Sequence, residues 1–291
     1  MKDLLGVGVD KPTNLSNVMA FGRWQRSRHP VDSPEGIVEC LDAILRAVDI
    51  ETVWALLHQF LESYGFTGVI YGYSHSFRGT TLGSPEEFLL LSTLDRRFMN
   101  ILVDNRYYGE SVTFNWALRN TGIASWSMTS EDAQMDGFVS SDDALTFFAR
   151  FGMEAGCTIG FPTASTRGRA VMALIAEPGL TQEDVDDCLA KFSDALFVVA
   201  TVAHRAMIAL PYLGTKRALT ARQREVLEWV AEGKTVADIA RIMGLAQPTI
   251  EKHLKLARET LGVETTAHAV IKAAFLNQMF VMPTKPANNS V

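Results

Sequence analysis

Cysteine is scarce in this sequence, and the marks of an exported or membrane protein are missing. Cys40, Cys157 and Cys188 are far apart, odd in number and form no C-x-x-C pair, which argues against a disulfide framework or a zinc site and is typical of a reducing cytoplasm. The N-terminus has no signal-peptide pattern. The most apolar stretch, residues 195–203, falls well short of the roughly twenty residues that span a bilayer. We therefore expect a cytoplasmic protein without a membrane partner.

Sequence patterns of common catalytic sites are also lacking. The chain contains no G-x-S-x-G, no P-loop and no H-E-x-x-H, the motifs that would indicate an acyl-transfer, nucleotide or zinc site. We expect no enzyme, no cofactor and no metal. The alternative from another class, an enzyme with an appended DNA-binding module, finds little support in the residues.

Charge is divided unevenly along the chain. The net charge is −6, but residues 216–291 hold eleven basic and seven acidic side chains, a net +4, and residues 1–215 hold sixteen basic and twenty-six acidic ones, a net −10. Such asymmetry suggests a nucleic-acid-binding module joined to a different domain.

Residues 34–210 alternate between extended and helical patterns, after an extension at residues 1–33 that we expect to be flexible. Capping residues and apolar spacing predict helices at residues 34–48 and 49–65, through Phe98 and Leu102, and at residues 142–153. Segments rich in β-branched and aromatic residues predict strands at residues 66–73, 88–93, 122–128, 157–163 and 169–176. Helices that flank several strands favour an α/β sandwich.

A long helix is predicted at residues 181–209, beginning at a T-x-x-D cap formed by Thr181 and Asp184. Its second half is apolar almost all round, so it must be covered on more than one side. The sandwich would cover one side and a second subunit the other, which indicates a homodimer. The alternative is a central helix within one monomer.

Four short helices are predicted in residues 219–282, between a linker at residues 211–218 and a flexible tail at residues 283–291. Thr220 caps the first helix, and a box of Thr235 and Asp238 caps the second, with Ile242 facing inward. Gly244 lies in the turn before a third helix at residues 248–261, and a fourth covers residues 266–279. This arrangement predicts a helix-turn-helix module whose third helix enters the DNA major groove.

This module resembles the DNA-binding domain of LuxR-type regulators through the motifs LT-x-R-x-REVL, W-x-A-x-GKT, IA-x-I and TI-x-KH. The resemblance implies base contacts from Glu251, Lys252 and Lys255, and phosphate contacts from Thr235, Thr249 and Arg258. A solvated helix face is the alternative for each of these side chains. Two family habits are missing: Gln223 replaces a Glu, and Ala246 replaces the Ser that caps the third helix, which should cost about 1 kcal/mol.

Residues 34–210 are similar in order and length to the α/β/α, antiparallel-sheet domain with which LuxR-type proteins bind acyl-homoserine lactones. The local matches are FLLLSTLDRRF, NRYYGESVTF, Trp126 and EAGCTIGFP, and they imply a ligand contact from Trp126 and from Gly160. The polar anchors of the family do not carry over: Phe98, Leu102 and Ser111 stand where it has Trp, Tyr and Asp.

Other residues remain candidates for such a ligand site. Glu110 would replace the lost acid if the loop shifts by one residue. The aromatic side chains that either line a ligand cavity or belong to ordinary core are Tyr71, Tyr107, Trp116 and Trp126.

Two hypotheses for the input follow from these substitutions. In the first, a dimeric regulator binds an acyl-homoserine lactone or a related small-molecule signal, which raises the fraction competent for DNA. In the second, the regulator needs no ligand and is controlled by its level or by a protein partner. Double-stranded DNA is the expected partner in both, together with a second copy of the chain, and RNA polymerase is a further candidate.

Overall fold

The computed structural model describes residues 33–75, 77, 88–127, 142–163, 165, 168–211 and 218–280. The chain divides between Met207 and Ile208 into two compact units, and each is described by itself. The predicted extension before residue 33, most of the predicted linker and the predicted C-terminal tail lie outside the described residues.

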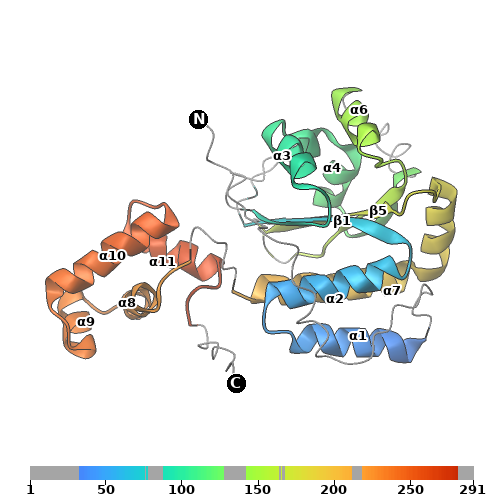
Figure 1. Ribbon diagram of the computed structural model, residues 1–291. Helices are drawn as coiled ribbons and strands as arrows, with labels where there is room; N and C mark the ends of the chain where they lie inside the picture. Colours follow the sequence, from blue (N-terminus) through green and yellow to red (C-terminus); the bar gives the residue numbers. More distant parts are fainter. Residues whose placement is uncertain are drawn as a thin grey trace, which may run out of the picture. The chain divides into compact units, whose positions relative to one another are not determined.

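An antiparallel sheet forms the middle layer of the N-terminal unit (Figure 1). The strands follow one another across the sheet in the order β2-β1-β5-β4-β3, and every neighbouring pair is antiparallel. Their bounds are Phe66–Ser74 for β1, Leu89–Ser92 for β2, Gly122–Ser125 for β3, Gly156–Gly160 for β4 and Arg169–Ala176 for β5. The predicted α/β class and antiparallel sheet are confirmed.

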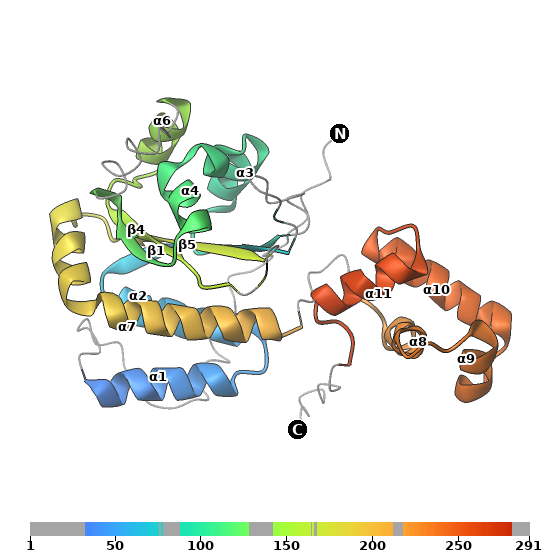
Figure 2. The same cartoon turned by 180° about the vertical axis from the view of Figure 1, so that it is seen from behind.

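Helices cover both faces of this sheet (Figures 1 and 2). One face carries α2 (Ile50–Glu62) and α7 (Gln182–Ala209), with α1 (Pro34–Arg46) beyond them; the other carries α3 (Arg96–Asp104), α4 (Val112–Arg119) and α6 (Asp142–Arg150). A short 3-10 helix, η3 (Tyr107–Glu110), precedes α4. The three layers form an α/β/α sandwich.

Local capping chemistry sets where the helices of the N-terminal unit begin. Ser33 accepts a hydrogen bond from the backbone N–H of Gly36, and Asp49 accepts one from Thr52, so α1 and α2 begin where their caps predict. At α7, the Asp184 carboxylate accepts from the backbone N–H of Thr181 at 2.8 Å, and the Thr181 hydroxyl accepts in return from the Asp184 N–H at 3.3 Å. The T-x-x-D box is therefore formed.

Of the helices in the described ranges, α7 is the one long and apolar enough to span a membrane by composition, with a mean hydropathy of 1.4. Its apolar side chains belong to the core of the N-terminal unit, since Leu196, Val199 and Ala203 are fully buried. Val198, in contrast, is 45% exposed. α7 is therefore a core helix on the side that faces the sheet, and Val198 is an apolar side chain exposed outside that side.

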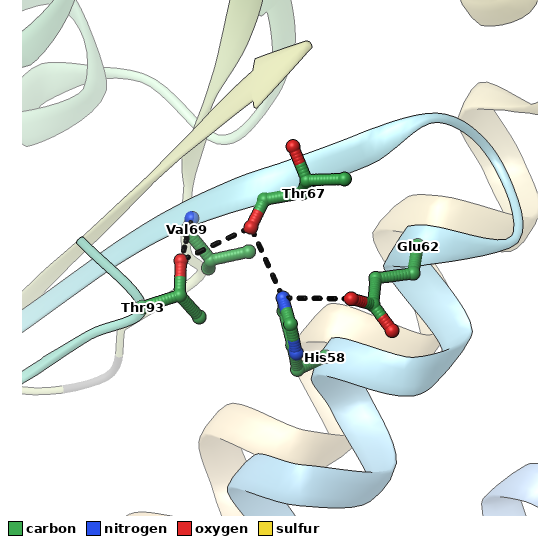
Figure 3. Close-up of polar contacts among 5 residues, drawn as sticks. All are labelled: His58, Glu62, Thr67, Val69 and Thr93. Carbon is green, nitrogen blue, oxygen red and sulfur yellow. Dashed lines mark hydrogen bonds and ion pairs between the residues drawn. The ribbon is translucent and has the colours of Figure 1, made fainter. Parts of the chain in front are cut away.

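The start of β1 is held by side chains from two other elements (Figure 3). The pairing of β1 with β5 is irregular between Phe66 and Gly68. The Thr67 carbonyl there accepts a hydrogen bond from the Thr93 hydroxyl at 3.2 Å and from His58 Nε2 at 3.1 Å, and the Val69 N–H donates to the same hydroxyl at 2.8 Å. Because a carbonyl can only accept, His58 carries its proton on Nε2.

The C-terminal unit is a bundle of short helices: α8 (Ala221–Ala231), α9 (Val236–Met243), α10 (Gln247–Leu261) and α11 (Thr266–Phe275). Val226, Leu227, Ile239, Ile250 and Ala257 are among the side chains that form its core. The predicted module of four short helices is thus present within the described residues 218–280. One detail was wrong: Ile242 is 47% exposed, because the buried stripe of the short α9 is formed by Ile239 and Ala240.

Candidate functional site

The turn between α9 and α10 has the geometry of a helix-turn-helix. Thr235 and Asp238 form a reciprocal capping box at the start of α9, and the hydrogen bonds from Thr235 lower the pKa of Asp238. Gly244 ends α9 with a φ of 66°, a left-handed conformation that glycine adopts without strain. α10 then begins after Ala246, whose methyl side chain cannot act as a cap acceptor. The chain turns sharply between the two helices, as the sequence predicts.

α10 has one buried and one charged face. Ile250, Leu254, Ala257 and Leu261 point into the core, whereas Glu251, Lys252 and Lys255 are exposed. The Lys255 ammonium lies 3.8 Å from the Glu259 carboxylate, with both side chains more than half exposed, so this pair contributes little and can be exchanged for another partner. Two cations and one anion are therefore exposed on α10 between positions 251 and 255.

The three predicted phosphate contacts differ in exposure and in hydrogen-bond partners. Thr235 is exposed, but its hydroxyl donates to Asp238 at 2.6 Å. Arg258 is half-buried and its guanidinium donates to the Thr266 hydroxyl at 3.0 Å, which ties α10 to α11. Thr249 is half-buried in the first turn of α10. Thr235 and Arg258 therefore both have a structural role as well.

The substitution of Gln223 for a Glu does not disturb α8. The Thr220 N–H donates to the Gln223 side-chain oxygen at 2.8 Å, and the Gln223 N–H donates to the Thr220 hydroxyl at 3.3 Å. An amide oxygen accepts this hydrogen bond as a carboxylate would, so the capping box is complete.

In the N-terminal unit, an aromatic cluster lies between the sheet and α3. Phe98 is buried and stacks on Phe147 with ring centroids 4.9 Å apart, and Tyr107 lies 4.9 Å from Phe147. Leu102 is buried in the same cluster, which packs against Ile70 of β1. Phe98 and Leu102 therefore supply apolar surface and no hydrogen-bond donor.

Trp126 lies on this same face of the sheet, at the end of β3. Its indole N–H donates to the Thr158 hydroxyl at 2.8 Å, and a Cβ at Gly156 would approach the indole to 2.9 Å. Thr158 is opposite Ala173 of β5, which is opposite Ile70 of β1. Residues directly opposite each other share a face, so Trp126 and the Phe98 cluster belong to one layer.

Gly160 also faces this layer, where α4 covers it. A Cβ at Gly160 would lie 2.1 Å from the Asn120 carbonyl oxygen and 2.7 Å from that of Ala117. The glycine therefore allows the end of α4 to approach β4. The structure places backbone against this residue, and the ligand contact that the resemblance implies for it stays a prediction.

Glu110 and Ser111 lie at the junction of η3 and α4. Ser111 is the N-cap of α4, and its hydroxyl accepts from the Phe114 N–H at 3.4 Å and lies 2.9 Å from the Thr113 hydroxyl. Glu110 is half-buried in η3. The Ser111 hydroxyl, which stands where the family has an Asp carboxylate, therefore caps α4.

Family models match both units. Residues 49–207 match the autoinducer binding domain, and residues 217–273 match the luxR family of bacterial regulatory proteins. The first match alone covers more than half of the chain. The protein is a LuxR-type regulator. This family consists of transcription regulators and not of enzymes, and its helix-turn-helix module binds DNA.

Individual relatives of this LuxR-type regulator differ in how much they share with it. It is 43% identical over 58 residues to the transcriptional activator protein AnoR of Acinetobacter nosocomialis, a match that covers 20% of this chain and 24% of AnoR. It is 21% identical over 247 residues to ExpR of Dickeya dadantii, covering 81% of this chain and 93% of ExpR. A crystal structure of Escherichia coli SdiA is similar with 15% identity and a TM-score of 0.49, covering 85% of this chain and 99% of SdiA.

Tyr71 of this LuxR-type regulator is on the opposite face of the sheet from Phe98. The preceding residue, Ile70, packs on the Phe98 cluster, and successive strand residues face opposite sides. The Tyr71 hydroxyl instead lies 2.8 Å from His204 Nδ1 of α7. Burial raises the pKa of Tyr71 and lowers that of His204 to about 4, so both are neutral near pH 7. Tyr71 therefore lies outside the layer that holds Phe98 and is part of the core between the sheet and α7.

Thr158 is the residue of this layer that sequence reasoning missed. It alternates with Gly156 and Gly160 along β4, so its hydroxyl is the one side-chain polar group on that face of the strand. The pattern G-x-T-x-G within a predicted strand could have indicated it. Thr158 fixes the direction of the Trp126 indole.

Proposed function

We propose that this LuxR-type regulator binds double-stranded DNA by inserting α10 into the major groove, with Glu251, Lys252 and Lys255 at the base edges. The observation that carries the proposal is the exposure of these three side chains, at positions 251, 252 and 255, on a helix whose opposite face is core. Lysine can donate to guanine O6 and N7, and glutamate can accept from the cytosine amino group. Thr235, Thr249 and Arg258 flank this face, and we assign them to the phosphates.

The test compares two variants of equal charge. Lys252→Ala with Lys255→Ala removes two cations from α10, and Arg222→Ala with Lys272→Ala removes two from α8 and α11. Each base contact is worth about 1–3 kcal/mol, so the first variant should bind the operator at least roughly twenty-five-fold more weakly. The second variant should lose only the small, salt-dependent affinity that comes from general charge. Affinities are measured by fluorescence anisotropy, and equal losses of affinity in the two variants would refute the assignment of the base contacts to α10.

For the N-terminal unit, we propose a site for an acyl-homoserine lactone or a related small molecule in the layer between the sheet and α3, α4 and α6. Phe98, Tyr107 and Trp126 supply its apolar and aromatic walls, and Glu110 and Ser111 lie at its edge. The match to the autoinducer binding domain supports a small-molecule ligand. Binding would stabilise this unit and raise the fraction of protein competent for DNA.

A specific observation favours a second candidate, a regulator that needs no ligand. Phe98 and Leu102 are already buried in one apolar cluster, and the Ser111 hydroxyl caps α4. Thermal unfolding with a panel of acyl-homoserine lactones separates the two. A ligand at a hundred times its Kd stabilises by about 2.7 kcal/mol, which raises the Tm of a unit of this size by roughly 5–10 °C. If no lactone raises the Tm, the first candidate fails in its narrow form, that of an acyl-homoserine lactone receptor.

We further propose that the regulator acts as a cytoplasmic homodimer on promoters read by RNA polymerase. Ile271 and Phe275 of α11 are each about half exposed, and Val198 of α7 is 45% exposed, so both units carry apolar surface suited to a second copy. Sedimentation equilibrium tests the dimer: Ile271→Glu should weaken self-association. A monomeric wild-type chain at micromolar concentration would contradict it.

A further inference from the structure

A polar cluster joins α7 to the strand end that carries Trp126. The two serines on either side of this tryptophan donate to one carboxylate of α7: Ser125 to Asp186 Oδ1 at 2.5 Å and Ser127 to Asp186 Oδ2 at 2.8 Å. The Ser127 backbone N–H also donates to the Ser125 hydroxyl at 3.1 Å. Both backbone neighbours of Trp126 are therefore attached to α7.

Gln182 extends this cluster to the strand beneath the indole. Its side-chain amide N–H donates to Ser125 Oγ at 2.9 Å and to Asp186 Oδ1 at 3.0 Å, and its amide oxygen accepts from the Gly156 N–H at 2.9 Å. The Gly156 carbonyl accepts from the same amide at 3.1 Å. Because the Trp126 indole packs where a Gly156 side chain would be, the cluster holds both the tryptophan and the surface on which it lies.

The cluster crosses the edge of the sheet. Ser125 is opposite Cys157, and its hydroxyl reaches α7 on one face, whereas the Trp126 indole reaches Thr158 on the other. β3 is one of the two edge strands of the sheet, and among the residues that the structure describes it pairs with β4 alone. An edge strand of four residues has few backbone hydrogen bonds to hold its end, so side chains must fix it.

The carboxylate is well suited to this role. Burial raises the pKa of Asp186, but hydrogen bonds from Ser125, Gln182 and Ser127 together lower it by more, so the pKa lies below its ordinary value. The ionised form is therefore the one that the cluster stabilises. Charge-assisted hydrogen bonds of this kind are shorter and stronger than neutral ones.

We propose that Asp186 is a positioning residue for Trp126: with Gln182, it fixes the indole on the ligand-facing side of the sheet and couples that side to the first turns of α7. This inference rests on the ligand site proposed above. α7 continues from this cluster to Ala209, where the predicted linker to the DNA-binding unit begins. A ligand that displaces the indole would therefore act on α7 through two serines and one carboxylate.

The test labels the full-length protein with 5-fluorotryptophan and follows the Trp126 resonance by fluorine NMR without any ligand. The chain has five tryptophans, and Trp126→Phe identifies the relevant signal. Asp186→Ala should shift and broaden this signal and leave that of Trp229, the tryptophan of the C-terminal unit, unchanged. Asp186→Asn, which keeps one acceptor oxygen, should restore part of the shift.

Asp184→Ala is the matched control, because Asp184 lies half a turn away and caps α7 through Thr181 without contacting β3. It should lower the Tm and leave the Trp126 signal in place. If Asp186→Ala lowers the Tm in the same way with an unmoved Trp126 signal, Asp186 only stabilises the helix and the proposal is overturned. Ser127→Ala removes one donor from an exposed position and gives the same readout should Asp186→Ala not fold.

Affinity for N-octanoyl-homoserine lactone provides the second readout. If the wild-type protein binds this probe, Asp186→Ala should raise the Kd by about tenfold, which corresponds to about 1.4 kcal/mol, while Asp184→Ala should leave the Kd unchanged. Equal affinity of Asp186→Ala and wild type would overturn the coupling to the ligand. If the wild type does not bind, the proposed lactone site fails, and the NMR signal alone still decides whether Asp186 positions Trp126.

Discussion

Replacing Gly160 with alanine should destabilise the N-terminal unit strongly, whether or not a ligand is present. The added Cβ would lie 2.1 Å from the Asn120 carbonyl oxygen and 2.7 Å from that of Ala117, whereas real Cβ atoms essentially never come within 3.0 Å of another heavy atom. Both contacts are with backbone, so β4 and the end of α4 must separate by about 1 Å, since no side chain can rotate away.

The expected cost follows from this geometry. Overpacking that moves backbone typically costs about 1–3 kcal/mol and occasionally more, and a rigid double contact belongs at the upper end. At about 3 kcal/mol, the Tm of a unit of this size should fall by roughly 6–12 °C. Circular dichroism during thermal unfolding, with urea midpoints as a second measure, gives the value.

Gly72→Ala is the matched control. Gly72 lies on the same face of the same sheet, but its added Cβ would meet only Leu90, at an ordinary distance of 3.8 Å. Such a change should be neutral or stabilise slightly, because alanine reduces the entropy of the unfolded chain. A Gly160→Ala protein that unfolds at the temperature of the Gly72→Ala protein would refute the close approach of α4.

Three further predictions concern single side chains. Burial lowers the pKa of His204 from 6.5 to about 4, so the unfolded chain binds the proton more tightly than the folded one. His204 should therefore contribute up to roughly 3 kcal/mol of stability, fully present above pH 6.5 and lost as the pH falls toward 4. His204→Gln should make the urea concentration at the unfolding midpoint depend less on pH over that range, and an unchanged pH dependence would count against the buried, neutral His204. Ala246→Ser should add about 1 kcal/mol to the C-terminal unit by restoring a cap, measured by its Tm; no gain would mean that another group already satisfies the helix end. Thr93→Val should lower the free energy of unfolding by about 1–3 kcal/mol, because it leaves the Val69 N–H without its acceptor. Thr67→Val is the control and should cost less, since it keeps the backbone carbonyl that Thr93 contacts. Equal Tm values for the two variants would contradict the role of the Thr93 hydroxyl.

Features that depend on neighbouring residues along the chain could be predicted from the sequence. Asp49 and Thr235 cap their helices as expected, because a cap is decided within four residues. The same holds for Ala246, whose inability to cap α10 can be inferred from its side chain alone. The DNA-facing side of α10 follows from helical spacing, since one stripe is clearly apolar.

Features that depend on packing between distant parts of the chain could not be predicted from the sequence. The two faces of the central sheet are both buried, so the alternation in β1 does not reveal which face Tyr71 occupies. α4 was not expected, because several of its residues are poor helix formers: Val112, Thr113, Phe114 and Trp116. The Ser111 cap, packing on Val171 of β5 and the close approach to Gly160 of β4 stabilise it. The contact between Gly160 and α4 joins residues 40 positions apart and has no local signal.

The apolar wall formed by Phe98, Leu102 and Phe147 has a consequence for how selectively such a layer can respond. A site rejects an analogue strongly when the analogue leaves one of its buried hydrogen-bonding groups unpaired, whereas one methylene more or less in an apolar wall changes binding by only about 1–3 kcal/mol. These three side chains contribute no group of the first kind. Discrimination by this wall alone would therefore follow the size and shape of the group that packs on it, and strong selection of one ligand would have to come from polar groups elsewhere in the layer.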